Sequence, residues 1–398
     1  MKKATTTSCD ITIVGGGMAG LTLALALAPL ELSITIVEAQ SPESLTSTAY
    51  DGRTSAIAYG SRLVFESLGV WESMAKDSGE IRDIRIANNH SPLYLHYDHR
   101  LVGKEPMGHI IENRFIRQAL FSAIKKHKNI RLLAPEMCSG LSLSAHRAAL
   151  RLKSGKNIET SLLVSAEGKH SRLRSIAGMT VRERDYGQTA IVCVAKHKKH
   201  HNGVAVEQFL PAGPFAILPM GGGHHSSLVW TETRDRAPHY LAMSDADFNF
   251  ELQKRFGQFL GPVEIKGNRW SYPLSLTYAT RYVADRFVLV GDAAHSIHPI
   301  AGQGLNLGIR DVALLSELIR ERALLGLDFA SPDALSTYES RRMSDSNLMI
   351  SATDGLNLLF SNQSKMLGTL RKFGLFTVDK VAPLKKVLIK HAMGTLYD

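Results

Sequence analysis

The sequence predicts an α/β fold in which a discontinuous first domain holds an inserted antiparallel sheet. Three observations predict this arrangement. A strand, a glycine turn, a helix and a second strand open the chain over residues 11–38. From Tyr186 to Trp230, short alternating strands separated by proline and glycine turns replace that pattern. A buried strand at Phe287–Val290 and another glycine turn then follow, so the first domain resumes after the insertion.

The opening unit follows from its residue types. Ile11–Val14 is apolar and rich in β-branched residues, as in a strand buried on both faces. Leu21–Ala28 is rich in leucine and alanine and predicts a helix, which Pro29 helps to end. Ser33–Val37 predicts the next strand, and Glu38 comes directly after it.

Later segments predict further elements from their apolar spacing and their turn residues. The predicted helices are Ser55–Leu68, Asn113–Lys126 and Ser244–Phe259, and the predicted strands of the insertion include Gly203–Leu210 and Phe215–Pro219.

Composition indicates a globular protein and narrows its partners. The chain is 44% apolar and 21% charged, which is ordinary for a folded domain with a large core. Cys9, Cys138 and Cys193 are far apart and lack metal-ligand spacing, so we expect unpaired thiols, a reducing compartment and no metal site. The net charge of +10 attracts phosphates in nucleic acid, lipid or a cofactor. Without a nucleic-acid-binding motif, we expect no nucleic-acid partner.

The apolar stretch Ile11–Leu30 imitates a signal peptide or an anchor. Asp10 precedes it, Gly15–Gly17 would break a signal helix, and Glu31 ends it. No other apolar run approaches the ~20 residues that cross a bilayer. We therefore expect a cytoplasmic protein.

The glycine turn over residues 15–20 matches the G-x-G-x-x-G pattern of dinucleotide-binding folds. Gly15 permits the tight turn, Gly17 lets the backbone approach a pyrophosphate, and Gly20 allows the helix to pack closely on the strand. Met18 and Ala19 begin the helix, whose free N–H groups point at the phosphates.

Glu38 ends the second strand at the position where a carboxylate accepts ribose hydroxyls. It favours NAD or FAD over NADP, because it would repel a 2′-phosphate.

A second motif favours FAD over NAD. Asp292 follows a buried strand, and a carboxylate there is costly to bury without donors, which the ribityl hydroxyls of FAD supply. Gly302, Gly304, Leu305 and Asn306 then lead into a helix. Its N–H groups and dipole can stabilise negative charge on a reduced flavin. One long cofactor that touches both motifs explains their separation.

These motifs resemble the single-component flavin-dependent aromatic hydroxylases of the p-hydroxybenzoate hydroxylase type. The matching segments are GGGMAG with Glu38, AEGKHSRLR at 166–174 and GDAAHSIHPIAGQGLNLG at 291–308. Further segments resemble the ubiquinone-biosynthesis hydroxylases, most closely the 2-polyprenyl-6-methoxyphenol hydroxylases. They are Asp51–Arg53, Ala58–Ser61, Glu112–Asn113, Asp185–Gln188, Gly213–Pro219, Tyr338–Arg341 and Thr353–Ser361. The resemblance extends over nearly the whole chain.

The resemblance implies a Rossmann-like FAD-binding domain over 1–75, 108–180 and 276–345, a substrate domain over 76–107 and 181–275, and a C-terminal helical region over 346–398. It also implies that reduced flavin activates O2 and that a polyprenylated phenol takes one oxygen atom on its ring. NAD(P)H is the expected electron donor. No protein nucleophile is required; His295 and His298 lie beside the flavin motif as candidates for proton transfer, or as packed histidines.

The resemblance implies cofactor contacts at matching positions. Arg53 and Arg117 would contact the FAD, and Asp292 its ribityl–pyrophosphate region. The adenosine half would be held by Gly15, Gly17, Gly20 and Glu38, and the isoalloxazine framed by Gly302, Gly304 and Asn306.

One position departs from the family pattern. Glu167-Gly168 stands where the family has Asp-Gly, in a motif associated with both FAD and NAD(P)H. The extra methylene displaces the carboxylate, and displacements of about 1 Å matter in a reactive site. Lys169, Arg172 and Arg174 are expected to supply cationic partners for phosphates.

Two basic segments allow more than one interpretation. Lys196–His201 joins two predicted strands and is expected to be a solvated hairpin rather than a metal or nucleic-acid site. Lys365–Met393 is basic and amphipathic, and it fits either a membrane-surface helix or a helix docked on the FAD domain. Because the expected substrate is lipid-like, we leave two expectations open. The protein contacts the inner face of a membrane peripherally, or it belongs to a multienzyme complex.

Two other functions stay open. A prenyl-group reductase or epoxidase of the same superfamily would keep the fold and change the chemistry. A non-catalytic subunit of a ubiquinone-synthesis complex would bind FAD but catalyse no reaction.

Overall fold

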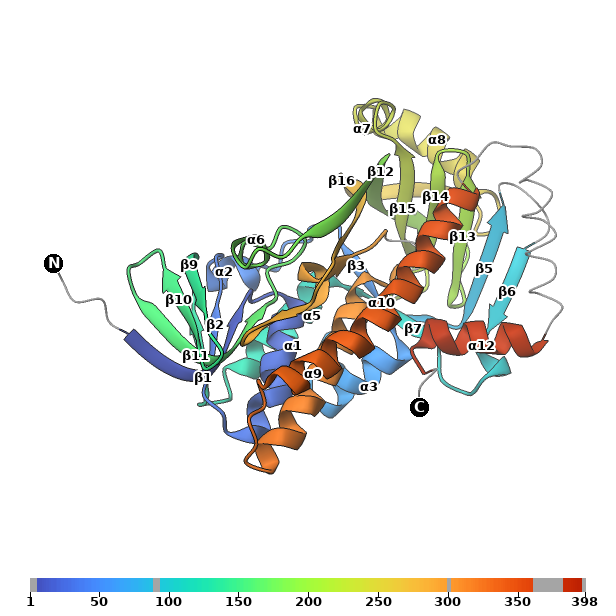
Figure 1. The fold of residues 1–398 in the computed structure, drawn as a ribbon. Helices are drawn as coiled ribbons and strands as arrows, with labels where there is room; N and C mark the ends of the chain where they lie inside the picture. Colours follow the sequence, from blue (N-terminus) through green and yellow to red (C-terminus); the bar gives the residue numbers. More distant parts are fainter. Residues whose placement is uncertain (1–5, 89–93, 299–301, 361–381, 396–398) are drawn as a thin grey trace.

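The computed structural model describes residues 6–88, 94–298, 302–360 and 382–395 (Figure 1). Within these residues the strands form two eight-stranded sheets and one three-stranded sheet. The predicted α/β fold with an inserted sheet is confirmed.

The first sheet is the parallel sheet of the opening unit. Its order is β17-β18-β11-β1-β2-β8, with the hairpin β9–β10 on the edge of β11. Every neighbouring pair from β18 to β8 is parallel. The central strands of this sheet are apolar, as expected where both faces of a sheet are covered. The bounds are β1 Thr6–Val14, β2 Ile34–Val37, β8 Ile130–Leu133, β9 Cys138–Leu143, β10 Ala148–Leu152, β11 Asn157–Ser165, β17 Val283–Ala284 and β18 Phe287–Leu289.

Helices cover this sheet. In sequence order they are α1 (Met18–Leu27), α5 (Asn113–Ile124) and α9 (Gly304–Leu324), and α1 packs against both others. The long α10 (Pro332–Phe360) follows α9 and reaches from β17 of the first sheet to β14 of the second (Figure 1). Shorter elements are η1 Ala28–Leu30, α2 Pro42–Leu45, α3 Tyr59–Ser67, α4 Trp71–Ala75, α6 Arg172–Ile176 and η3 Gly291–Ala293.

The second sheet has the order β19-β16-β12-β15-β14-β13-β5-β6 and is antiparallel except for the pair β13–β5. Its bounds are β5 Asp83–Asn88, β6 Tyr94–Asp98, β12 Val181–His197, β13 Val204–Leu210, β14 Gly213–Pro219, β15 His225–Thr233, β16 Val263–Ala279 and β19 His295–Ser296. The connecting helices are η2 His99–Leu101, α7 Ala237–Leu241 and α8 Asp245–Phe256. The small third sheet joins β3 (Thr54–Ala58), β7 (Gly108–Glu112) and β4 (Gly79–Ile81).

The predicted helix Ser55–Leu68 is wrong in its first part. Thr54–Ala58 forms β3, which pairs with β7, and helix α3 begins only at Tyr59. Ile57 is fully buried by this pairing. Strand β7 lies about 50 residues later, so a local pattern contains no sign of it.

The predicted hairpin at Lys196–His201 is wrong, although the three lysines of the segment and His200 are exposed as expected. Strand β12 pairs with β15 and β16, whereas β13 pairs with β14 and β5, so the segment links strands that are not neighbours. His197 and His201 are 4% and 6% exposed. Their rings bond the backbone carbonyls of Lys199 and Met220 at 2.7 and 2.8 Å, respectively, which accounts for their burial.

The described part of the C-terminal segment is a docked helix. In α12 (Ala382–Met393), Ile389 and Met393 are buried in an apolar cluster with Met107 and Ile110. Arg310 of α9 donates to the carbonyl of His391 at 3.4 Å. Residues 365–381 lie outside the described residues. No helix within the described ranges combines the length and apolarity needed to cross a bilayer.

Candidate functional site

A cavity of about 410 Å³ separates the glycine turns of the first sheet from one face of the second sheet. The carboxyl ends of β1, β11 and β18 point toward it, which is where ligands of parallel sheets bind. On the first side its lining includes Gly17, Met18, Ala19, Arg53, Gly168, Asp292, Gly302, Gly304 and Leu305. On the second side it includes Glu207, Pro214, Ala216, Leu218, Val229 and Thr231.

The first glycine turn needs its glycines for two reasons. Gly15 has φ +110°, and a Cβ there would lie 2.3 Å from the carbonyl oxygen of Ala166. A Cβ on Gly20 would lie 2.0 Å from the carbonyl oxygen of Gly15, so α1 could not approach the strand. Gly17 instead faces open space in the cavity, as expected for the glycine that a pyrophosphate approaches.

Glu38 holds the glycine turn from outside the cavity lining. Its two carboxylate oxygens accept from the backbone N–H groups of Gly16 at 2.6 Å and Gln40 at 2.7 Å. The side chain is therefore fixed beside the start of α1, next to the predicted pyrophosphate position. A contact between Glu38 and a ribose stays a prediction.

Asp292 lies on the cavity wall at the end of β18. Its side chain is exposed to the cavity, and the surrounding protein raises the pKa of its carboxyl group by desolvation, against the opposing effects of His295 and Lys169. Among the described residues no donor binds this carboxylate. An acid that faces a cavity without a protein partner fits the hydroxyls of a ribityl chain. The open glycine turn and Asp292 face the same cavity, so these residues fit FAD.

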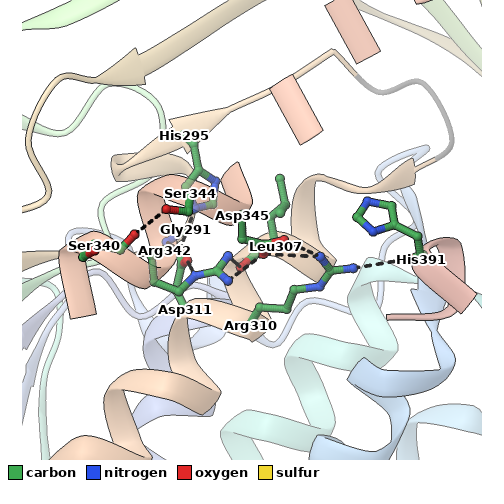
Figure 2. Close-up of polar contacts among 10 residues, drawn as sticks. All are labelled: Gly291, His295, Leu307, Arg310, Asp311, Ser340, Arg342, Ser344, Asp345 and His391. Atoms are coloured by element: carbon green, nitrogen blue, oxygen red, sulfur yellow. Dashed lines mark hydrogen bonds and ion pairs between the residues drawn. The ribbon is translucent and has the colours of Figure 1, made fainter. Parts of the chain in front are cut away.

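A buried carboxylate, that of Asp311, binds the turn that contains Gly291 and Asp292 (Figure 2). Asp311 of α9 is 0% exposed and accepts from the backbone N–H of Gly291 at 2.7 Å. It also bonds Nε2 of His295 at 2.8 Å and Nε of Arg342 at 2.6 Å. Burial opposes ionisation, but the charges and hydrogen bonds of His295 and Arg342 outweigh it and lower the pKa of Asp311. Asp311 is therefore a buried anion with its partners in place.

This network continues to the C-terminal helix. Arg342 donates to Asp345 at 2.6 Å, and Arg310 bonds the same carboxylate at 3.1 Å. Arg310 also contacts the carbonyl of His391 in α12, as Figure 2 shows. The sequence analysis missed this network. Its one local signal is an aspartate among the apolar residues of α9.

The two candidate histidines have different surroundings. His295 is fully buried against Asp311 and does not line the cavity. His298 lines the cavity, with its ring 5.1 Å from that of Tyr186 in an edge-on arrangement. Burial lowers the pKa of His298 to about 4, so its ring is neutral at pH 7.

Arg53 and Arg117 share one carboxylate. Arg53 lines the cavity and contacts Asp51 at 3.0 Å, and Arg117 contacts the same side chain at 3.2 Å. Two further residues line the cavity, Ser55 and Asn113. The hydroxyl of Ser55, which the sequence analysis missed, donates to the side-chain oxygen of Asn113 at 2.7 Å.

Asn306 is buried and fixes β3 to the start of α9. Its side-chain oxygen accepts from Ala58 and its amide donates to Ala56, both at 2.9 Å. It therefore frames the cavity indirectly. Residues 299–301, which precede Gly302 in the predicted flavin motif, lie outside the described residues.

Glu167 caps helix α6. Its carboxylate accepts from the hydroxyl of Ser171 at 2.8 Å and from the N–H of Leu173 at 2.9 Å. The expected phosphate-binding role of Arg174 is wrong, because its buried guanidinium donates to the carbonyls of Ala293 and Lys169, both at 2.8 Å. Arg174 thus binds the turn that carries Asp292.

Comparisons with known proteins agree with this architecture. Residues 8–353 match the family model described as an FAD binding domain. The chain is 44% identical to the ubiquinone hydroxylase UbiL of Rhodospirillum rubrum over 97% of this chain and 90% of that protein. It is 33% identical to the 3-demethoxyubiquinol 3-hydroxylase of Escherichia coli, over 97% and 98% of the two chains.

Among solved structures, p-nitrophenol 4-monooxygenase PnpA of Pseudomonas putida superimposes with a TM-score of 0.80 at 16% identity. The match covers 98% of this chain and 99% of that one. At that identity the likeness establishes the fold.

Proposed function

Because this chain belongs to the FAD-binding monooxygenase family that includes the ubiquinone hydroxylases, we propose that it hydroxylates the ring of a polyprenylated phenol in ubiquinone biosynthesis. The observation that carries the proposal is one cavity with two unlike walls. One wall has the glycine turns and Asp292, and the other is an apolar sheet face that suits an aromatic ring.

The chain's own residues bind and orient the reactants. Bound FAD supplies the oxygen chemistry by reduction and reaction with O2. The free N–H groups of Gly17, Met18 and Ala19 would bind its phosphates, and the carboxylate of Asp292 would bind its hydroxyls; all four residues line the cavity. The apolar residues of the second sheet exclude water from the reacting ring. The division into FAD-binding, substrate and C-terminal regions is part of the proposal.

NAD(P)H is the proposed electron donor. Lys169 lies next to the cavity residue Gly168 and contacts the hydroxyl of Ser275 on β16. Arg172 is exposed at the start of α6. These cations support binding of a dinucleotide phosphate near the turn that Glu167 caps.

The purified protein is expected to be yellow and to release FAD on denaturation. With NADH or NADPH and O2, it should add one oxygen atom to the ring of an alkylphenol, detected by mass analysis of the product. A colourless protein that cannot be reconstituted would refute the proposal. Saturation of the prenyl chain, or oxygen in the chain instead of the ring, would support the reductase or epoxidase. Bound FAD without any product would support the non-catalytic subunit.

We also propose that the exposed face of α12 contacts an anionic membrane or a partner of the same pathway. Lys386, Val387 and Lys390 are exposed there, while Ile389 holds the helix in place. Each basic residue near an anionic surface contributes ~1 kcal/mol. Reversing Lys386 and Lys390 to glutamate should therefore weaken flotation with anionic vesicles by at least about tenfold. The same reversal at exposed Lys153 and Lys156 is the control, and equal effects of the two pairs would contradict the contact.

A further inference from the structure

The sheet wall of the cavity is apolar except at Glu207 and Thr231. Glu207 of β13 lies opposite Ala216 of β14, which lies opposite Val229 of β15, and on its other side Glu207 pairs with Ile86 of β5. These four residues form one row across the same face of the sheet. Of the described sheet residues that line the cavity, Glu207 alone has a titratable side chain.

Two other cavity residues, Thr231 and His298, have polar atoms that are not accessible at the cavity surface. The hydroxyl oxygen of Thr231 and both ring nitrogens of His298 are buried beneath the cavity surface, without a hydrogen-bond partner among the described residues. The carboxyl of Glu207 also has no partner there, but it opens on the cavity. It is therefore the polar group of this wall that an incoming ligand can reach.

We propose that Glu207 is a substrate-positioning residue, whose carboxyl hydrogen-bonds the ring hydroxyl of the phenol and so orients the ring toward the flavin side of the cavity. The inference deepens the proposed function and rests on it. A lone polar group in an apolar pocket sets orientation and selects ligands that carry a matching hydroxyl, because a ligand without one leaves the group unpaired.

The carboxyl performs this role in its neutral form. Desolvation alone raises the pKa of Glu207 to about 8. On β5 and β14 the residues of the same sheet face are uncharged, and on β15 that face carries the titratable His225 at its far end. The charged or titratable groups that line the cavity besides Glu207 are Arg53, Asp292 and His298. None of these three shifts the pKa of Glu207. A bound apolar ring removes more water from the carboxyl, so substrate binding favours the neutral acid. Affinity for a neutral phenol should fall as the pH rises through 8.

Binding to the FAD-loaded protein tests this role without turnover. An ortho-alkylphenol and the matching alkylbenzene are titrated into wild-type protein and Glu207→Leu, Glu207→Gln and Thr231→Val variants, and the flavin absorption reports binding. Wild-type protein should prefer the phenol by roughly 10- to 100-fold, as for one buried hydrogen bond. Glu207→Leu should abolish this preference. Glu207→Gln should keep it, since the amide is neutral and also donates and accepts, and Thr231→Val should change it little.

The pH profile separates positioning from a structural role. Wild-type affinity for the phenol should be about tenfold weaker at pH 9 than at pH 7, whereas Glu207→Gln should be flat over that range, in which the phenol itself stays neutral. Equal preference in wild type and Glu207→Leu, loss of preference in Thr231→Val instead, or a wild-type affinity that rises with pH would each overturn the inference. Those outcomes leave the flavoprotein assignment intact; a protein that binds no FAD fails the proposed function itself.

Discussion

Replacing Asp311 by alanine is expected to lower the free energy of unfolding by about 3–5 kcal/mol. The carboxylate is fully buried and binds the N–H of Gly291, the ring of His295 and the guanidinium of Arg342. Its removal leaves these three donors buried without their partner, and that desolvation penalty exceeds the loss of an ordinary hydrogen bond. Urea unfolding of the FAD-free protein measures the change directly.

A matched control lies on the same pair of helices. Asp333 of α10 contacts Arg322 of α9 at 2.8 Å, but its side chain is 69% exposed. Asp333→Ala should therefore leave the unfolding midpoint nearly unchanged, because exposed ion pairs contribute little. An Asp311→Ala protein as stable as the Asp333→Ala protein would show that the buried network does not hold the turn.

Replacing Asp292 by alanine is expected to weaken FAD binding by roughly 10- to 150-fold, the effect of one hydrogen bond to a charged acceptor. The stability of the FAD-free protein should not fall. Asp292 is exposed to the cavity and has no partner among the described residues, so its removal breaks no contact within the FAD-free fold. Quenching of FAD fluorescence by the apoprotein gives the affinity.

The control for Asp292 is Asp285, an exposed acid between β17 and β18 of the same sheet. Asp285→Ala removes the same charge from the same region and should leave FAD affinity unchanged. Unchanged affinity in Asp292→Ala would place the ribityl chain elsewhere in the cavity.

Local patterns in the sequence predicted the parts of the fold that depend on neighbours in the chain. The turn from β1 to α1 needs Gly15 and Gly20 for contacts within a few residues or with an adjacent parallel strand, and its glycine spacing is distinctive. Asp292 was likewise recognised as a candidate cofactor-binding residue, because an acid directly after an apolar strand is unusual. The helix Asn113–Lys126 was recognised from its apolar spacing and ends two residues early, at Ile124.

The errors come from long-range pairing. Thr54–Ala58 is a strand only because Gly108–Glu112 lies beside it, and Lys196–His201 does not form a hairpin because β12 and β13 have other partners. Asp311 depends on Arg342, which is brought near by the packing of α10 on α9. Glu207 could have been recognised as a candidate site residue from the sequence, because it is the single acid in the strand Val204–Leu210.

The placement of β18 beside β11 has a consequence for the order of synthesis. Roughly 120 residues separate the end of β11 from β18, so at ~5–20 residues per second the ribosome delivers β18 on the order of ten seconds later. Until then, part of the β11 edge of the parallel sheet has no partner strand. The hairpin β9–β10 already covers Asn157–Thr160 of β11, but Leu163–Ser165 must wait for β18. This short apolar stretch is where the nascent chain is most open to pairing with another molecule.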